Sequence, residues 1–306
     1  YLLEDRWRKK KSQSQKKKGV QSSWWGRMKV VYGHTDSIYV KIDSIDKAKK
    51  AVVEINNHVR ESFPNVLGLS EHPVVLEFEK YFSRLGVGAT KNRNAGLISW
   101  KDGKYLDEPE FVMTGFTAKR LSITKLAKET QMSILKMWVG QFTEEEITGM
   151  LKKAYYAVLE GRVPVEYLIN RSRFRPERLS YKCKNCKKQL SIQDCINAHK
   201  EAQRDSHESC CPKCGQPIDV VTQEGRRPSI GSGIEGVIWN HQNEENKIDD
   251  SYVFLRVADD VQRATYINPV TGVRKRPSYI SASTVEELEQ HKADLPHYAE
   301  SIIKKA

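Results

Sequence analysis

The sequence of 306 residues has no long hydrophobic run, and no segment has the features of a signal peptide or a membrane span. Hydrophobic residues nevertheless make up 39% of the chain, which is enough to bury one or two cores. These features exclude an integral membrane protein of the helical kind. They predict soluble globular material without a membrane partner.

Acidic residues are too few to balance the basic ones. The chain has 51 Lys and Arg against 39 Asp and Glu, which gives a formal charge of +12 and a pI near 9.3. This excess favours a polyanionic partner, nucleic acid before a membrane surface, and the alternative is a basic protein whose charge only keeps it soluble. Residues 1–23 contain KKK twice and are predicted to be a flexible basic arm, either a solvated tail or a nucleic-acid contact. Packed structure is expected to begin at Trp24 and Trp25.

Cysteine is absent outside one short stretch. All six cysteines lie between Cys183 and Cys214, which favours a metal site in a reducing compartment over a disulfide framework. Two CxxC pairs, Cys183 with Cys186 and Cys211 with Cys214, have 24 residues between them. This spacing predicts a zinc ribbon at about residues 181–217 in which four thiolates hold a structural Zn²⁺ tetrahedrally.

Other donors lie near these pairs. Cys210 adjoins Cys211 and is an alternative ligand in a shifted register. Cys195, His199 and His207 are expected to stay uncoordinated. Beyond the ribbon, the loop Arg226–Gly236 is rich in Gly, Ser and Pro but has no GKS or GKT after its glycines, so it is not predicted to hold a phosphate.

The stretch Lys29–Lys41, KVVYGHTDSIYVK, places a carboxylate on a bend between two apolar runs. The runs are β-branched or aromatic, and the turn formers Gly33–Ser37 separate them, which predicts a β-hairpin with Asp36 at its tip. A hairpin tip can hold a metal-binding carboxylate rigidly. The alternative is a surface hairpin whose turn residues are merely polar.

The segments after this hairpin predict an α+β fold. Apolar residues recur at helical spacing from Ser44 or Asp46 to Phe63, and Pro64 marks the end of that helix. An antiparallel sheet is then expected, with Asp102 and Gly103 in a hairpin turn. Its strands are Val74–Glu79, Leu85–Ala89, Ala95–Trp100 and Phe111–Thr114. The first strand would place Glu77 and Glu79 on one face.

From Ser122 onward the pattern is mainly helical. One helix is expected to end at Gly140, and the next begins with a capping box formed by Thr143 and Glu146 and ends at Gly161. The elements expected after these helices are a strand at Val165–Ile169, a strand at Tyr252–Val257, a hairpin at Val270–Pro277, and helices from Thr284 and from Pro296.

The motif YGHTDS resembles the YxDTDS signature of family B DNA polymerases, the group that includes archaeal replicative polymerases. The resemblance implies that Asp36 is a catalytic residue that binds Mg²⁺, with Tyr32, His34 and Thr35 beside it. His34 stands where the family has its first aspartate, and an imidazole is a poor magnesium ligand. Either that carboxylate is dispensable here, or activity is reduced.

Two further segments resemble the same family. TKNRNA (Thr90–Ala95) is similar to TKKRYA, which touches the minor groove of the primer and template, although Asn94 replaces the tyrosine. AKETQ (Ala127–Gln131) resembles the first helix of the archaeal thumb domain. An acidic strand beside the family's metal site would place Glu77 or Glu79 near the ions, and ordinary solvent-facing glutamates are the alternative. The predicted DNA-binding residues are Lys91, Arg93, Lys119, Arg120, Arg171, Arg173 and Arg175.

The sequence lacks other motifs of the family. It has no DxxSLYP, no KxxxNSxYG and no exonuclease motif, so the resemblance covers residues 28–306 without the ribbon and corresponds to the C-terminal third of a polymerase. It implies the C-terminal part of a palm at residues 24–121, then a mainly helical thumb at 122–306 with the zinc ribbon inserted.

On this basis the chain is identified as the smaller part, or a fragment, of a split DNA-directed DNA polymerase located in the cytoplasm of a prokaryotic cell or a virus-infected host. Two Mg²⁺ ions would be shared with a large polymerase chain that carries the exonuclease, the fingers and the rest of the palm. Primer–template DNA and dNTP would bind, and a sliding clamp is a further candidate partner. The alternatives are a catalytically degenerate, zinc-stabilised subunit for DNA binding or assembly, and an accessory factor whose functional part is the ribbon.

Overall fold

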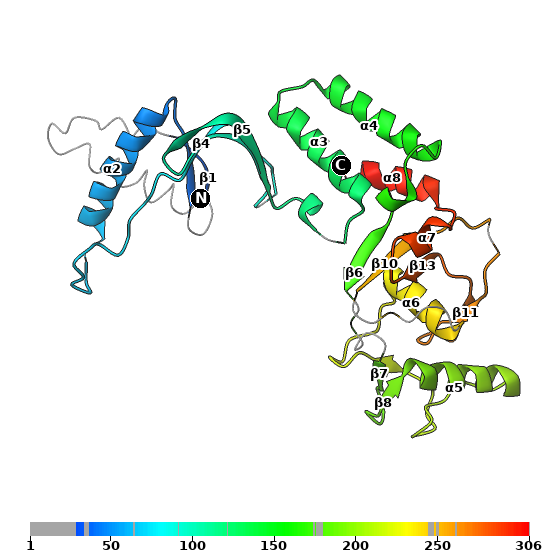
Figure 1. Ribbon diagram of the computed structural model, residues 1–306. Coiled ribbons are helices and arrows are strands. Elements are labelled where there is room, and N and C mark those ends of the chain that lie inside the picture. Colours follow the sequence, from blue (N-terminus) through cyan, green and yellow to red (C-terminus); the bar gives the residue numbers. More distant parts are fainter. Residues whose placement is uncertain are drawn as a thin grey trace. The chain divides into compact units, whose positions relative to one another are not determined.

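The computed structural model describes residues 29–33, 37–63, 65–90, 92–120, 122–173, 175, 180–243, 248, 251–260 and 262–305. The chain divides between Thr114 and Gly115 into two compact units (Figure 1). The predictions for the basic arm and for His34, Thr35, Asp36 and Lys91 fall outside the described residues, as does the side chain of Lys119.

The first unit begins with a two-stranded antiparallel ribbon, β1 (Lys29–Gly33) and β2 (Ile38–Lys41). Helix α2 (Ile45–Ser62) follows, and the hydroxyl of Ser44 caps it by accepting a hydrogen bond from the backbone N–H of Lys47 at 3.3 Å. The predicted hairpin and helix are therefore confirmed.

A three-stranded antiparallel sheet in the order β3-β4-β5 completes this unit. Its strands are Lys80–Val87, Asn94–Lys101 and Lys104–Thr114. Asp102 and Gly103 form the predicted turn, with φ of 49° and 86°, the left-handed values that a tight hairpin needs. The predicted strand Val74–Glu79 is wrong, because the chain there has no regular secondary structure and β3 begins only at Lys80. The side chain of Asn56 instead bonds both backbone groups of Leu76 at 2.8 Å.

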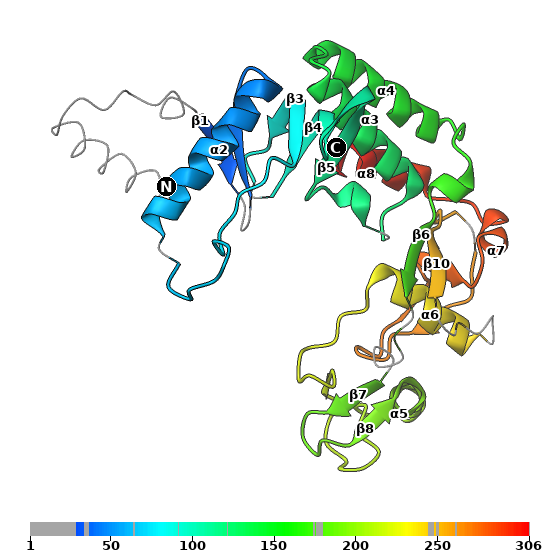
Figure 2. The same cartoon turned by 60° about the vertical axis from the view of Figure 1, so that its left-hand side comes forward.

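The second unit begins with helices. The segment Thr117–Lys119 forms a short 3₁₀ helix, η2, and α3 (Lys125–Val139) and α4 (Glu144–Leu159) follow. The capping box of Thr143 and Glu146 at the start of α4 is confirmed. Helices α3 and α4 pack with the last helix, α8 (Leu295–Lys305) (Figure 2). The predicted strand at Val165–Ile169 is wrong: a 3₁₀ helix, η3 (Val165–Tyr167), stands there.

The second unit also contains a three-stranded sheet and a two-stranded ribbon. One sheet has the order β13-β10-β6, formed by Tyr279–Ala282, Ser251–Arg256 and Asn170–Arg173. A short ribbon pairs β11 (Tyr266–Ile267) with β12 (Arg274–Lys275), so the predicted hairpin at Val270–Pro277 contains only the second strand, and the first lies before it. Helix α7 (Glu286–Glu289) precedes α8, and the backbone N–H of Thr284 donates to Glu287 at 3.1 Å.

The cysteine-rich region forms a third small sheet. It has the order β8-β7-β9, formed by Gln189–Ser191, Ser180–Cys183 and Val220–Val221. Helix α5 (Ile192–Asp205) lies beside it and was not predicted, although Ser191 and Asp194 form a capping box at its start.

Helix α6 (Ser232–Gln242) corrects the prediction of a loop at Arg226–Gly236. A Cβ at Gly233 would lie 2.6 Å from the ring of Tyr252, and one at Gly236 would lie 2.4 Å from the hydroxyl of Ser281. The glycines therefore allow α6 to pack closely against β10 and β13. They do not make the segment irregular.

Candidate functional site

Strands β1 and β2 pair to form the hairpin that carries the YGHTDS motif, which we call the motif hairpin. Gly33 lies opposite Ile38 in the last residue pair of the ribbon. The ring of Tyr32 meets that of Tyr39 edge to face at 5.3 Å, and Tyr39 in turn packs on Phe82 of β3 at 5.8 Å. These ring contacts hold the hairpin against the three-stranded sheet.

A hydrogen bond links the motif hairpin to the turn between β3 and β4. The hydroxyl of Tyr32 donates to Oδ1 of Asn92 at 3.1 Å. Asn92 has a φ of 62°, which asparagine adopts more easily than most residues. In the sequence only the turn propensity of Asn92 marks this residue, so its contact with Tyr32 is not predicted.

The turn that contains Asn92 also carries Arg93. The backbone N–H of Gly88 donates to the carbonyl of Arg93 at 2.8 Å, and the N–H of Arg93 donates to Thr90 at 3.3 Å. The side chain of Arg93 is exposed, whereas Asn94 is buried at the start of β4. The predicted DNA contact at Arg93 therefore lies on the same turn as the residue that binds Tyr32.

Glu77 and Glu79 are exposed, but they do not lie on a strand as predicted. Glu79 forms an ion pair with its neighbour Lys80, and this hydrogen bond raises the pKa of the Lys80 ammonium. Such a pair on the surface contributes little to stability.

In the second unit, the predicted DNA-binding arginines of β6 lie on one face of that strand. Arg171 and Arg173 are both exposed, and the residues between and before them are half buried. Arg120 and Arg175 are exposed as well. Arg171 lines a cavity of about 440 Å³ together with Lys125, Lys128 and acidic side chains such as Glu286. The acidic side chains beside Arg171 would repel a phosphate group. Arg173 and Arg175 are therefore the stronger candidates for phosphate contacts.

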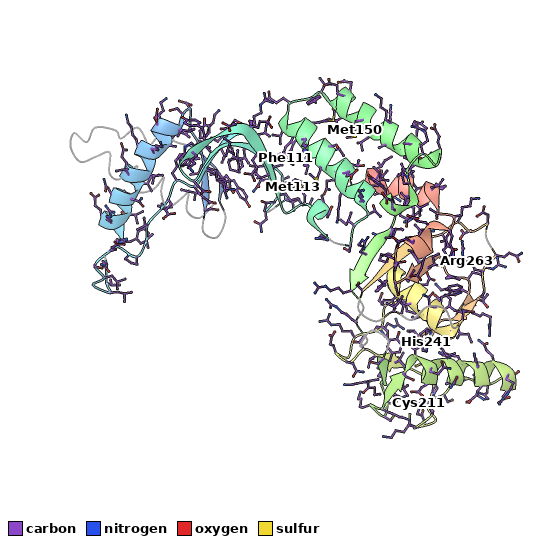
Figure 3. All side chains as sticks on the ribbon, in the orientation of Figure 1. Phe111, Met113, Met150, Cys211, His241 and Arg263 are labelled. Atoms are coloured by element: carbon purple, nitrogen blue, oxygen red, sulfur yellow. The ribbon has the colours of Figure 1, made fainter. Side chains whose placement is uncertain are left out.

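The four predicted zinc ligands come together. The sulfur atoms of Cys183, Cys186, Cys211 and Cys214 all lie within 4.8 Å of one another (Figure 3, which labels Cys211). The Sγ atoms of Cys183 and Cys214 are 3.9 Å apart, as are those of Cys186 and Cys211. Four thiolates at about 2.3 Å from a tetrahedral zinc ion are about 3.8 Å from each other, so the cluster fits Zn²⁺.

Tight turns form each half of this cluster. The N–H of Lys187 donates to the carbonyl of Cys183 at 3.0 Å, and the N–H of Gly215 donates to that of Cys211 at 2.9 Å. Lys187 and Gly215 have φ of 60° and 68°. Against the effect of burial, the backbone N–H groups of Lys213 and Cys214 lower the pKa of Cys211 to about 7. A thiolate is thus available near neutral pH, and metal binding would displace the other thiol protons.

The neighbouring donors have other environments. Cys195 lies fully buried in the core, where burial raises the pKa of its thiol to about 12. The thiol of Cys210 donates to the carbonyl of Glu208 at 3.3 Å and is not in the four-sulfur cluster. The hydrophobic core of this region contains Cys183 and Cys211 together with α6 residues such as Ile238. The cysteine-rich region therefore shares its core with α6.

His199 joins α5 to the loop before β12. Its Nε2 lies 3.2 Å from the carbonyl oxygen of Pro269, and its Nδ1 lies 2.8 Å from the hydroxyl of Ser209. Because a carbonyl can only accept, Nε2 carries the proton and Nδ1 accepts from Ser209. Burial lowers the pKa of this imidazole below its usual value of 6.5.

This environment gives a pH-dependent stability. As the pH falls through about 6.5, the unfolded chain binds a proton at His199 while the folded chain does not, so the free energy of unfolding should decrease. Above pH 7 both states are neutral and the contribution is constant. Urea unfolding between pH 5 and 8 should show a weaker pH dependence in H199N than in the native protein. H241N, which changes an exposed histidine in the last turn of α6, is the matched control.

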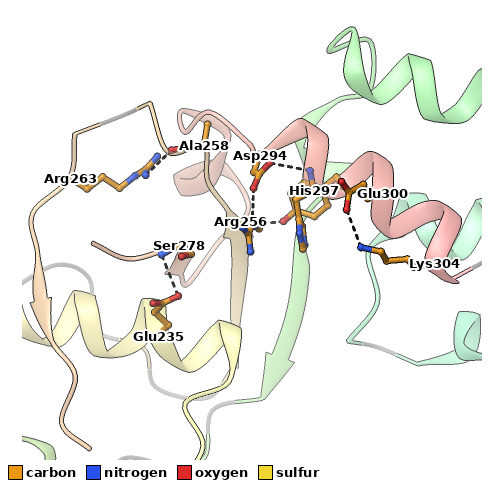
Figure 4. A network of polar contacts seen from close by, with 10 residues as sticks. Glu235, Arg256, Ala258, Arg263, Ser278, Asp294, His297, Glu300 and Lys304 are labelled. Atoms are coloured by element: carbon orange, nitrogen blue, oxygen red, sulfur yellow. Dashed lines mark hydrogen bonds and ion pairs between the residues drawn. The ribbon is translucent and has the colours of Figure 1, made fainter. Parts of the chain in front are cut away.

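A polar network anchors α8 to β10 (Figure 4). The hydroxyl of Tyr298 accepts from the backbone N–H of Arg256 at 2.8 Å, and Nε of Arg256 donates to Asp294 at 2.6 Å. Although burial opposes the shift, the hydrogen bond from Arg256 lowers the pKa of Asp294. Asp294 also accepts from the backbone N–H of His297 at 3.0 Å. These groups attach α8 to the sheet of β13, β10 and β6.

The secondary structure and the cysteine cluster define a structural class. An antiparallel sheet with a helix, a second unit of helices and small sheets, and four clustered thiols make a mixed helix-and-sheet chain that could hold a zinc ion. The family model of DNA polymerase family B matches residues 2–267. The chain therefore belongs to DNA polymerase family B.

Two known proteins illustrate the likeness. The DNA polymerase of Pyrococcus horikoshii is 27% identical over 144 residues, which are 46% of this chain and 10% of the relative. The chain thus spans about a tenth of the length of that relative. The structure of the family B DNA polymerase from the hyperthermophilic archaeon Pyrobaculum calidifontis matches with 15% identity and a TM-score of 0.44, covering 91% of this chain and 26% of that chain.

No helix in the described ranges combines the length and the apolar character that crossing a bilayer requires.

Proposed function

We propose that this chain is the palm and thumb part of a split family B DNA-directed DNA polymerase, active in DNA replication once a second chain supplies the missing motifs. The observation that carries the proposal is the hydrogen bond from Tyr32 to Asn92 at 3.1 Å. It joins the hairpin whose sequence resembles the metal-binding signature to the turn whose sequence resembles the primer-contacting segment. Family membership supports the same assignment.

The donor set of the motif explains why a second chain is needed. Residues 33–37 offer one carboxylate, at Asp36, and one imidazole, at His34. Magnesium prefers oxygen ligands, so Asp36 would hold it, and the other bridging carboxylate would come from the chain that carries DxxSLYP. Paired Mg²⁺ ions, when bound, activate the primer 3′ hydroxyl and neutralise the triphosphate.

The basic residues would hold the primer and template. Arg93 projects from the turn beside the motif hairpin, and Arg173 and Arg175 are exposed in the second unit. Guanidinium groups bind phosphate with two parallel hydrogen bonds, which positions a duplex without reading its sequence. The palm part would thus supply the metal-binding aspartate and the primer grip, and the thumb part would hold the duplex. The zinc ion would have a structural role, since four cysteines leave no open coordination position.

One observation favours a second candidate function. His34 replaces the first aspartate of the signature, so the motif has lost a negative charge. A catalytically degenerate subunit that binds DNA or assembles with other chains would tolerate this loss. The two functions differ in whether the carboxylate of Asp36 is needed for synthesis.

Primer extension tests whether DNA synthesis needs both chains. The reaction is run with this chain, with the polymerase chain of the same genome that carries DxxSLYP, and with both together. We expect extension only in the mixture, because each chain would hold one of the two bridging carboxylates. Equal synthesis by the larger chain alone would contradict the proposal and favour the non-catalytic function.

A further inference from the structure

The first unit exposes an unusual share of the apolar side chains. Among the described residues, twelve of the seventeen exposed large hydrophobic residues lie in residues 29–114, although that unit contributes only seven of the 41 buried hydrophobic residues. Single exposed apolar residues are normal, but a concentration of them marks an interaction surface. The second unit, by contrast, buries most of its apolar residues in two cores.

Five of these residues lie on one segment, which we call the apolar loop and define as residues 65–75. Val66 is 85% exposed and Leu67 is 72% exposed, and the other three are about half exposed. The three are Leu69, Val74 and Val75.

The apolar loop has a fixed conformation. The side-chain amide of Asn65 donates to the carbonyl of Leu69 at 2.6 Å, and its Oδ1 accepts from the N–H of Leu69 at 3.2 Å. Nε2 of His72 lies 2.5 Å from the carbonyl oxygen of Phe63. After the loop, Asn56 of α2 bonds both backbone groups of Leu76 at 2.8 Å. A surface ordered before binding loses less entropy when a partner is bound.

The charges near the apolar loop exclude a nucleic acid as its occupant. No Lys or Arg occurs between Arg60 and Lys80, whereas this segment contains Glu61, Glu71 and two further glutamates. A phosphate backbone would be repelled there, although the chain as a whole carries a charge of +12. The partner must instead present an apolar surface.

We propose that the apolar loop docks onto an apolar surface of the polymerase part that this chain lacks. The inference rests on the proposed function. The relative from Pyrococcus horikoshii is matched over only 10% of its length, so most of a family B polymerase is available to cover this surface. Burying side chains that are half to mostly exposed supplies the apolar contact that a stable interface needs at its centre.

The test compares two double variants of the full chain. V66E/L67E places two charges on the apolar loop. V273E/I303E places two charges on side chains of the second unit that are 57% and 56% exposed. Because all four residues are exposed, neither variant should unfold, which thermal unfolding checks. The probe is the separately purified polymerase chain of the same genome that carries DxxSLYP, and titration calorimetry measures its affinity.

We expect V66E/L67E to weaken the affinity at least ten-fold and V273E/I303E to leave it within two-fold. Equal affinities of the native chain and V66E/L67E would overturn the proposal. Sedimentation of the chain alone tests a second copy as the occupant: a native dimer that V66E/L67E converts to a monomer would also overturn it. D36N separates docking from chemistry, because it should bind the probe normally even if it does not support synthesis.

Discussion

Replacing Asp36 with asparagine should reduce primer extension by the assembled pair about 100-fold or more. The substitution keeps the size of the side chain and removes the negative charge that would bind the paired Mg²⁺ ions. A metal-bridging carboxylate contributes several kcal/mol to stabilising the transition state, and each ~1.4 kcal/mol is a ten-fold change in rate. Single-turnover extension of a primed template measures the effect at the chemical step.

The matched control is D43N, which changes an exposed aspartate shortly after the same hairpin. Asp43 pairs with Lys47 at 2.8 Å, and an exposed pair of this kind contributes little, so synthesis should be unchanged. DNA affinity should be the same in both variants. If D36N extends primers at the native rate, Asp36 is not a metal ligand and the non-catalytic function is preferred. H34D restores the first carboxylate of the signature and should raise the rate if its loss limits activity.

The substitution C211S should destabilise the second unit well beyond the ribbon. Cys211 is buried in a core that includes residues of α6, together with Tyr252 and Tyr266. Structural zinc contributes on the order of 10 kcal/mol to folding, and three thiolates hold it less well than four. We therefore expect the loss of several kcal/mol of unfolding free energy, a lower zinc content by elemental analysis, and a lower thermal midpoint. Chelation of zinc from the native chain should have the same effect.

The neighbouring substitution C210S provides the control. Cys210 donates a hydrogen bond to Glu208, a serine hydroxyl can do the same, and its sulfur is outside the four-sulfur cluster. Its zinc content and unfolding midpoint should match the native values. If instead C210S loses zinc and C211S keeps it, Cys210 is the ligand and the shifted register is correct. If neither variant nor chelation changes the midpoint, the cluster holds no structural metal.

The sequence predicts the elements that depend on local signals. The β1–β2 hairpin depends on turn formers between two short apolar runs, and the start of α4 depends on the capping box of Thr143 and Glu146. The cluster of four cysteines depends on spacing alone, because two CxxC pairs are typical of a site in which four thiolates surround one metal ion. In each case, the residues that specify the feature lie close together in the chain or carry a fixed pattern.

The failures occur where distant residues decide the structure. Leu76 lies in an alternating segment typical of a strand, yet Asn56 satisfies its backbone groups from twenty residues away. The contact between Tyr32 and Asn92 spans sixty residues, and no pattern in either segment indicates it. The glycines of α6 likewise predict a loop when the sequence is taken alone, because their packing partners in β10 and β13 follow later in the chain.

The close packing of α6 against β10 and β13 has a consequence for related chains. Hydrogen atoms at positions 233 and 236 set how near the helix axis comes to β10 and β13, since a methyl group at either position would collide with Tyr252 or Ser281. Sequences with alanine or larger side chains at both positions must therefore hold this helix further out. The side-chain volumes at positions 233 and 236 would thus predict, from sequence alone, how far α6 lies from β10 and β13 in each relative.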